Sequence, residues 1–235
     1  MTSTEVLLRH ATEADAAAVA EVYLAARRAA PMPAPVRSDD EIRAWVAERL
    51  RGDDETWVAE SAGEVVGFAR LAGDWLDDLY VVPRRSREGI GSALLELVKS
   101  LRPQGFCLWV FETNEPARRF YARAGLFELV RSDGSDNEER APDLQVAWPG
   151  EQPLAFLRGL VDEVDAELGA LLERRLALTR AIQAVKPVGG PQGRDAERER
   201  QIALRMSGFA PSLGAERLQR IVHAVITESL DAASD

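Results

Sequence analysis

The chain has 235 residues, a length that predicts two domains, and its 46% hydrophobic and 29% charged residues are typical of globular proteins. Its formal net charge of -10 is uneven: 18 basic minus 26 acidic residues give -8 up to residue 150, and 11 minus 13 give -2 after it. The acidic front half excludes a general attraction to nucleic acids or to anionic membranes.

The first 148 residues alternate between strand-like and helix-like patterns, which is typical of an α/β domain. We expect strands near 6–9, 57–60, 65–71, 76–82, 106–111, 126–131 and 144–148. We expect helices after Thr12, from Ser38 or Asp39, and over 89–101 and 115–124, with the prolines of 31–35 ending the first helix. The polar segment 132–140 is typical of a surface loop.

Targeting and metal-binding signals are weak in this chain. The N-terminus lacks a basic segment followed by a long apolar run, and no segment approaches about 18 apolar residues, so we expect a cytoplasmic protein without a membrane span. Cys107 is the only cysteine, which excludes an intrachain disulfide and a cysteine-based zinc site. It falls in the apolar run 106–111, so we expect a buried, inert thiol and no metal site.

The pattern changes after the segment 148–153, which carries two prolines and a glycine and predicts a domain boundary. From Leu154, apolar residues recur every three or four positions for about 32 residues, a helix of roughly 48 Å. Two shorter helices are expected near 195–206 and 215–232. Three helices make a small core, so we expect two copies to pair through the long helix.

A turn rich in arginine and glycine follows the strand at 76–82. Free N–H groups at the start of a helix carry partial positive charge, and Gly89 and Gly91 let a phosphate approach the backbone closely. Taken alone, this turn is also compatible with a simple strand-to-helix connection.

Two segments, one that contains this turn and one that follows it, resemble motifs of a known protein family. The segment LDDLYVVPRRSREGIGSALLELV (76–98) resembles the acetyl-CoA-binding motif of the GNAT N-acetyltransferase superfamily, and NEPARRFYARAGL (114–126) resembles that family's following motif. The resemblance covers residues 5–148 and implies a GNAT domain over 1–148, with a mixed central sheet flanked by helices. It implies acetyl-CoA as co-substrate, with Val81 and Val82 beside the pantetheine arm.

The same resemblance implies further contacts to acetyl-CoA. Its pyrophosphate would lie among Arg87, Glu88, Gly89, Ile90, Gly91 and Ser92, and Asn114 would contact the cofactor arm. Tyr121 would be the general acid for the departing thiolate, although packing beside Phe120 is an alternative role. The chain departs from the family at Ser86, where Arg or Gln is usual; Arg84, Arg85 and Arg87 are available to supply the charge.

The chemistry of the acceptor remains open in this first domain. Asp78 and Glu112, near strand ends, are candidates for the base that deprotonates the acceptor amine, which nothing in the sequence identifies. An alternative is a cofactor-binding or regulatory domain that has lost transferase activity.

Cations on the long helix point to a small dianion as ligand. Arg175 and Lys186 are 11 residues apart, about three turns and roughly 16 Å, so they lie on nearly one face. Arg158 lies 17 residues before Arg175, roughly 26 Å away on a straight helix, and cannot reach the same small ligand. If the three cations share a site, Arg158 comes from a second, antiparallel copy.

The rear segments carry a second resemblance. LAFLRGLVDEVDAELGALLERRLALTRAIQAVK (154–186), GRDAERERQIA (193–203) and VITESL (225–230) are similar to the three helices of the all-helical, AroQ-type chorismate mutases. This implies an all-α three-helix domain over 154–235, after a linker at 149–153, that forms an intertwined homodimer and needs no cofactor. Its substrate would be chorismate, rearranged to prephenate for aromatic amino acid biosynthesis in the shikimate pathway.

Roles follow from this resemblance position by position. Arg175 and the partner's Arg158 would bind the carboxylates of chorismate, and Lys186 would donate to one carboxylate and to the ether oxygen. Glu199 would accept the substrate hydroxyl proton beside the Asp195 backbone, with Arg198 and Ser229 completing the polar wall. Ala233 departs from the family, which usually has Gln or Glu there as a second donor to the ether oxygen.

The sequence therefore predicts a bifunctional enzyme, an N-acetyltransferase in front and a chorismate mutase behind. Because the same cations suit related chemistry, an isochorismate pyruvate lyase is an alternative for the rear domain. Ala233 keeps open a third possibility, a low-activity module that senses chorismate or an aromatic metabolite and regulates the acetyltransferase. Basic residues that alternate with acids argue against nucleic acid as a partner.

Overall fold

A computed structural model of the chain describes residues 5–52, 54–185 and 195–233. The chain divides into two compact units, Met1–Leu157 and Arg158–Asp235. Lys186, expected to contact the ligand of the rear domain, lies outside the described residues. Within those residues, every helix is too short or too polar to traverse a lipid bilayer.

The first unit is built on a seven-stranded mixed sheet. Its strand order is β1-β2-β3-β4-β5-β7-β6, in which β4 and β5 are parallel and every other neighbouring pair is antiparallel. The strands are β1 (Val6–His10), β2 (Glu55–Ser61), β3 (Glu64–Ala72), β4 (Trp75–Val81), β5 (Phe106–Phe111), β6 (Phe127–Ser132) and β7 (Asp143–Trp148). The predicted α/β domain with a mixed sheet is confirmed.

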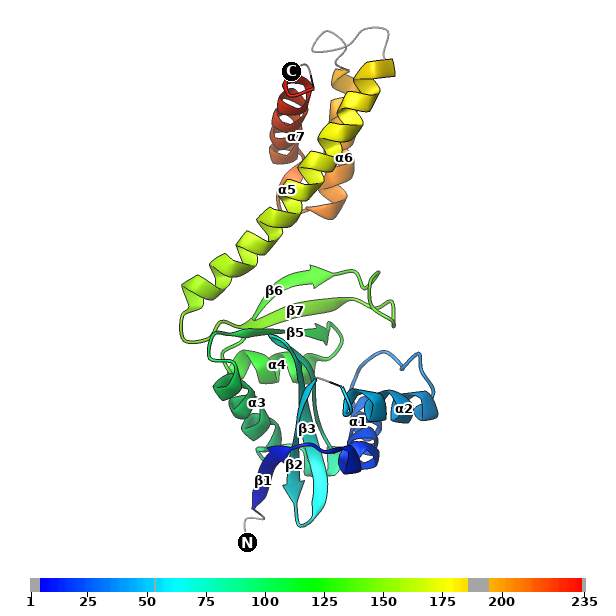
Figure 1. Cartoon of the computed structure of the whole chain (residues 1–235), viewed down its shortest axis with the longest axis vertical. Coiled ribbons are helices and arrows are strands. Elements are labelled where there is room, and N and C mark those ends of the chain that lie inside the picture. Colours follow the sequence, from blue (N-terminus) through cyan, green and yellow to red (C-terminus); the bar gives the residue numbers. More distant parts are fainter. Residues whose placement is uncertain (1–4, 53, 186–194, 234–235) are drawn as a thin grey trace. The chain divides into compact units, whose positions relative to one another are not determined.

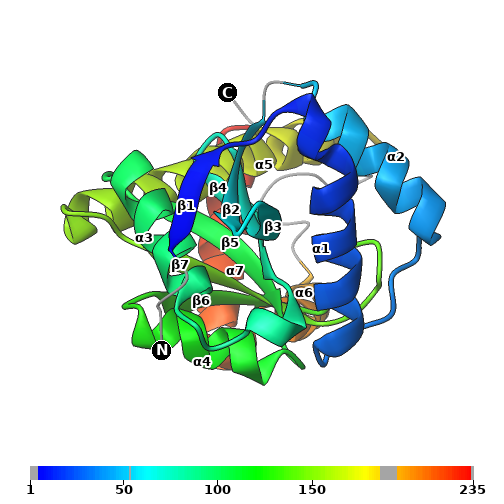
Figure 2. The ribbon, with the colours of Figure 1, turned by 90° about the horizontal axis from the view of Figure 1, so that it is seen from below.

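Helices cover both faces of this sheet, with α1 and α2 on one side and α3 on the other (Figure 2). The helices are α1 (Ala16–Ala29), α2 (Asp39–Arg49), α3 (Ile90–Leu101) and α4 (Glu115–Arg123), with short 3-10 turns η1 (Glu13–Asp15) and η2 (Pro83–Arg85). Ser38 begins α2 with a capping box, because its side chain and that of Glu41 bond to each other's backbone N–H. Thr12, predicted to cap the first helix, caps the turn η1, which runs directly into α1, and its backbone N–H donates to Asp15 at 2.8 Å.

The two middle strands separate soon after they meet. The only paired position between β4 and β5 is Trp75 with Cys107, so the strands diverge toward their C-terminal ends. Cys107 is 4% exposed, as predicted for a buried thiol. The divergence leaves an opening in the centre of the sheet, where the backbone of both strands lies open to a ligand.

A β-bulge in β4 shapes the same region. Arg70 of β3 faces Asp78, but the next residue, Leu71, faces Leu76, so Asp77 is an extra residue in β4. In a regular strand, neighbouring side chains point to opposite faces. The extra residue changes this alternation, and both Asp77 and Asp78 reach the guanidinium of Arg70.

The first unit continues past β7. Gly150 adopts a left-handed conformation with φ of 69°, and the N–H of Glu151 donates to the carbonyl of Pro103 at 2.9 Å. The ring of Phe156 lies so close to Gly105 that a Cβ there would come within 2.5 Å of it. The segment after β7 is therefore packed onto the turn before β5.

The second unit contains three helices: α5 (Pro153–Val185), whose first residues belong to the first unit, α6 (Ala196–Phe209) and α7 (Gly214–Asp231). The helices α6 and α7 lie beside the C-terminal half of α5 (Figure 1). Among the residues of this unit that the structure describes, few apolar ones are buried: Ala203, Leu218, Val222 and Leu230. The three predicted helices are confirmed.

One face of α5 is apolar and uncovered in the described chain. It consists of Val161, Val164, Leu168, Leu171, Arg175, Leu178 and Ile182, which we call the α5 seam. Its six apolar side chains are 50% to 63% exposed. The spacing alternates between three and four residues, the pattern by which two helices pack side by side in a coiled coil.

Candidate functional site

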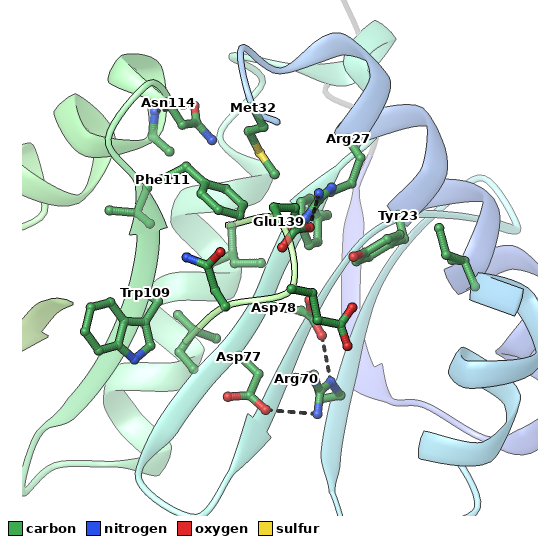
Figure 3. A pocket seen from close by; sticks show the side chains of 18 of the residues that line it. Tyr23, Arg27, Met32, Arg70, Asp77, Asp78, Trp109, Phe111, Asn114 and Glu139 are labelled. Carbon is green, nitrogen blue, oxygen red and sulfur yellow. Dashed lines mark hydrogen bonds and ion pairs between the residues drawn. The ribbon is translucent and has the colours of Figure 1, made fainter. Parts of the chain in front are cut away.

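The first unit contains a cavity of about 570 Å³ at the opening between β4 and β5. Its floor is formed by β4 from Leu76 to Tyr80 and by the end of β5 from Trp109 to Phe111. Side chains from α1, α2, α4 and the loop between β6 and β7 form its walls (Figure 3). A volume of this size is typical of small-molecule sites.

Acidic residues of the β4 bulge lie in this cavity beside Arg70. The Arg70 guanidinium contacts Asp78 at 2.6 Å, Asp77 at 3.0 Å and Asp54 at 2.8 Å. Burial raises the pKa of the Asp78 carboxyl above its ordinary value, although the charge of Arg70 opposes the shift. A carboxyl with a raised pKa, held in a cavity beside a fixed cation, is a stronger proton acceptor than an ordinary aspartate.

Tyr121 of α4 lies in the wall of the same cavity and is 8% exposed. Burial, and then the negative charge of Asp78, raise the pKa of its phenol, which therefore stays protonated as a donor. Its ring also packs edge-to-face on Phe120 at 5.2 Å between centroids. Tyr121 thus belongs to the core and to the cavity wall at once.

The glycine turn lies at the other end of β4. Gly89 precedes α3 with φ of 85°, and Arg87 has φ of 67°. No side chain caps the first turn of α3, and Arg87, Glu88 and Gly89 are exposed. Exposed N–H groups at the start of a helix, preceded by left-handed residues, form a site suited to the pyrophosphate of acetyl-CoA.

The glycine turn lies close to the sheet, and the position of Gly91 leaves room for no more than ordinary van der Waals contact. A Cβ on Gly91 would touch Val81 at 3.7 Å and Leu79 at 3.8 Å. Val81 ends β4, and Val82, expected to end the strand, lies just beyond it with its N–H donating to Val66 at 2.9 Å. Arg84 and Arg85 pair with Glu64 and Glu88. Among the three arginines near Ser86, Arg87 is the one for which the described part of the chain contains no ion pair.

Asn114 and Glu112 follow β5 and differ in position. Asn114 caps α4, since its Oδ1 accepts the N–H of Ala117 at 3.3 Å, and it also lines the cavity. Glu112 pairs with Arg131 of β6 and is not among the cavity-lining residues. Of the two candidate bases in the sequence, only Asp78 therefore faces the cavity.

The loop between β6 and β7 contributes residues that sequence reasoning missed. Glu139 of this loop pairs with Arg27 of α1 at 2.6 Å, with side chains 14% and 6% exposed. Glu138 pairs with Arg37, and Asn137 bonds to Asp143 at 3.0 Å. The segment is a surface loop, as its polar composition predicts, and it also closes one side of the cavity. No local signal in the sequence gives an ion pair between residues 112 positions apart.

The second unit brings together part of the predicted rear site. One N–H of Arg175, on the α5 seam, donates to the Ser229 hydroxyl at 2.6 Å, and Ser229 donates to the Val225 carbonyl at 2.6 Å. Ser229 is 8% exposed. A guanidinium held by a buried hydroxyl is fixed in orientation, as a bidentate carboxylate contact requires.

The other predicted rear residues that the structure describes lie at the cap and first turn of α6 and at the start of α5. The Asp195 side chain caps α6 by accepting the Arg198 N–H at 3.0 Å. Glu199 is 16% exposed and lies 3.6 Å from the Nδ1 of His223 on α7. Arg158 is exposed and lies 17 residues before Arg175 on one continuous helix, so the structure does not bring these two residues together within a chain.

Comparisons with known proteins also find two domains in this chain. The family model "Acetyltransferase (GNAT) family" matches residues 19–126, and "Chorismate mutase type II" matches residues 157–233. The peptidyl-lysine N-acetyltransferase YiaC of Escherichia coli is 33% identical over 110 residues, which cover 46% of this chain and 73% of YiaC.

A second relative has a solved structure. The peptidyl-lysine N-acetyltransferase YjaB of Escherichia coli is 34% identical over 95 residues, which cover 40% of this chain and 64% of YjaB. The solution structure of its apo form superposes with a TM-score of 0.53 at 25% identity, covering 62% of this chain and 99% of that one. The chain belongs to the GNAT acetyltransferase family and carries, behind its acetyltransferase domain, a chorismate mutase type II domain.

Proposed function

We propose that the first domain transfers an acetyl group from acetyl-CoA to an amine bound in the cavity between β4 and β5. The observation that carries this proposal is the placement of Asp78 and Tyr121 on one cavity, a proton acceptor and a proton donor. Acetyl-CoA supplies the acetyl thioester. Asp78 accepts the proton of the amine, and Tyr121 gives its proton to the departing sulfur.

The cofactor is held by the residues that surround the glycine turn. Backbone N–H groups from Arg87 to Ser92 bind the pyrophosphate, and Arg87 adds the charge that the family places at Ser86. The arm lies along Val81, Val82 and Asn114, at the opening where β4 is not paired with β5. The absence of a side-chain cap on α3 supports this fit, since it leaves donors available.

The acetyltransferase proposal has a direct test. The full chain is titrated with acetyl-CoA, and release of CoA is followed with a panel of amines. We expect saturable binding and amine-dependent CoA release. Binding without acetyl transfer to any amine contradicts the proposal and favours a regulatory domain that has lost activity.

We propose that the second domain converts chorismate to prephenate in a homodimer formed through the α5 seam. The rearrangement needs no nucleophile, so the protein binds the compact conformer and stabilises charge on the ether oxygen. The observation that carries this proposal is the Arg175–Ser229 contact beside a long uncovered apolar stripe. Arg198, Glu199, Asp195 and Lys186 complete the site.

The seam predicts how two copies meet. In an antiparallel pair, Val164 of one copy faces Leu168 of the other, Val161 faces Leu171, and Leu157 faces Arg175. This register brings the partner's Arg158, next to Leu157, to Arg175. The cations that a single helix keeps roughly 26 Å apart then share one ligand.

The test of the second activity follows the loss of chorismate absorbance and the formation of prephenate. Arg175→Ala is expected to abolish turnover, and Arg180→Ala, also on α5 but outside the seam, is the matched control. Formation of pyruvate and salicylate from isochorismate, without prephenate from chorismate, contradicts the mutase assignment. We further propose that 149–153 links the two domains and that the protein works in the cytoplasm, in aromatic amino acid biosynthesis.

A further inference from the structure

Aromatic rings form much of the cavity wall in the first domain. Tyr23, Trp45, Tyr80, Trp109 and Phe111 all line it. Tyr23 lies 5.0 Å from Tyr80 and 5.7 Å from Trp45 between ring centroids. Rings arranged in this way bind a flat apolar group by edge and face contacts. An acceptor that carries an aromatic ring fits this wall better than a bare alkyl amine.

Guanidinium groups border the same cavity, which a simple cationic amine does not require. Arg37 and Arg49 both lie over the Trp45 ring, at 6.0 Å and 5.9 Å from its centroid. Their side chains are 41% and 50% exposed, so a ligand can reach them. The two arginines lie on different segments, one before α2 and one at its end, and both contact the ring of Trp45 at the cavity wall.

The ion pairs of these two arginines are replaceable. Arg37 pairs with Glu138, whose side chain is 57% exposed, and exposed ion pairs are weak. Arg49 contacts Asp54 only at 3.4 Å, and Asp54 is shared with Arg70 at 2.8 Å. A carboxylate on the substrate can therefore bind these guanidiniums with two hydrogen bonds each.

Asp77 and Asp78 line the same cavity and adjoin this wall through Arg70, which pairs with both and lies 5.2 Å from the centroid of the Trp45 ring. They suit an ammonium group, and Asp78 is the proposed base. A molecule with an ammonium group, a carboxylate and an aromatic ring is an aromatic α-amino acid. The cavity of about 570 Å³ leaves room for it beside the acetyl thioester.

The second domain independently points to the same class of compound. Prephenate, the product of a chorismate mutase, carries an α-keto acid side chain on a six-membered ring. Loss of the ring carboxylate as carbon dioxide, together with the ring hydroxyl as water, makes the ring aromatic, and transfer of an amino group to the keto carbon then gives an aromatic α-amino acid. The reactions that join the two domains of this chain are therefore a decarboxylation with loss of water and a transamination.

We propose that the acceptor of the first domain is the α-amino group of a free aromatic amino acid. This proposal rests on the acetyl transfer proposed above. A bond forms between the amine nitrogen and the acetyl carbon while the carbon–sulfur bond breaks. The amine proton passes to Asp78, and the sulfur receives the Tyr121 proton, so the products are an N-acetyl amino acid and CoA.

The experiment uses the full chain with acetyl-CoA and four acceptors: L-phenylalanine, phenethylamine, L-leucine and a lysine peptide with a blocked N-terminus. CoA release gives the rates, and mass spectrometry identifies the products. We expect kcat/KM for L-phenylalanine to exceed that for each of the other three by about ten-fold or more, because each lacks the ring or the carboxylate beside the amine.

Two variants test the carboxylate contact. In Arg37→Gln and Arg49→Gln, we expect KM for L-phenylalanine to rise by about 10- to 100-fold, while KM for phenethylamine stays unchanged. Arg43→Gln is the matched control, because Arg43 lies on α2, pairs with Glu21 and Asp40, and does not line the cavity. Its kinetics with both acceptors are expected to match those of the original chain.

Each contrary outcome has a distinct meaning. Acetylation of the lysine peptide without acetylation of L-phenylalanine overturns this proposal and leaves the acetyltransferase function standing. Equal loss with phenylalanine and phenethylamine in both arginine variants overturns the carboxylate contact and, with it, the amino acid as acceptor. Acetyl-CoA binding without transfer to any of the four acceptors contradicts the proposed function itself.

Discussion

Asp78 combines burial with a cation at 2.6 Å, and the net result is a raised pKa. Because a base works only when deprotonated, we expect kcat/KM of the acetyltransferase to rise with pH through a pKa above the ordinary aspartate value. Asp78→Asn is expected to remove this dependence and to lower kcat by about 100- to 10,000-fold. The pH–rate profile of both proteins checks this, with Glu112→Gln as control. If Asp78→Asn is as active as the original chain, Asp78 is not the base.

Ala233 ends the described chain where related mutases carry a hydrogen-bond donor. An absent donor to a developing oxyanion lowers turnover by about 100- to 1,000-fold in enzymes where it has been removed. We therefore expect Ala233→Gln to raise kcat for chorismate with little change in KM, measured by prephenate formation. Ala232→Gln, one position away, is the control. If both substitutions leave kcat unchanged, the ether oxygen has another donor in this chain.

At the scale of one secondary structure element, Gly89 at the start of α3 has a matched control in Gly63, in the turn between β2 and β3. Gly89 and Gly63 both have positive φ, 85° and 80°, and a Cβ on either would meet nothing within 4 Å. Alanine at either position adds backbone strain of about 1–2 kcal/mol. We expect only Gly89→Ala to weaken acetyl-CoA binding, as measured by titration, because only Gly89 adjoins the pyrophosphate site. Equal affinities in the two variants would place the pyrophosphate elsewhere.

The elements themselves could largely be predicted from sequence. Periodicity identified the seven strands and the long helix, because each pattern depends only on neighbours along the chain. The bulge at Asp77 could not be predicted, since one extra residue in β4 has meaning only against its partner β3. For the same reason, the Arg27–Glu139 pair and the cavity position of 137–139 emerged only from the fold.

At the scale of the whole molecule, the rear site needs residues from two copies, and mixing variants tests this. A dimer of one Arg158→Ala chain and one Arg175→Ala chain has one complete site and one that lacks both arginines. Each variant alone is expected to be inactive, and an equal mixture is expected to recover about a quarter of the original activity, because half the dimers are mixed. The recovered activity is measured as the rate of prephenate formation after the two variants have exchanged subunits. A mixture that stays inactive contradicts the shared site.

Arg175 occupies a position of the α5 seam that neighbouring turns fill with valine, leucine or isoleucine. In the proposed pair, two guanidinium groups enter an otherwise apolar contact, and they oppose its formation until anions neutralise them. Ligand occupancy and subunit association are then thermodynamically linked. The dissociation constant between subunits falls as the dicarboxylate concentration rises, so the supply of ligand itself sets the population of assembled enzyme.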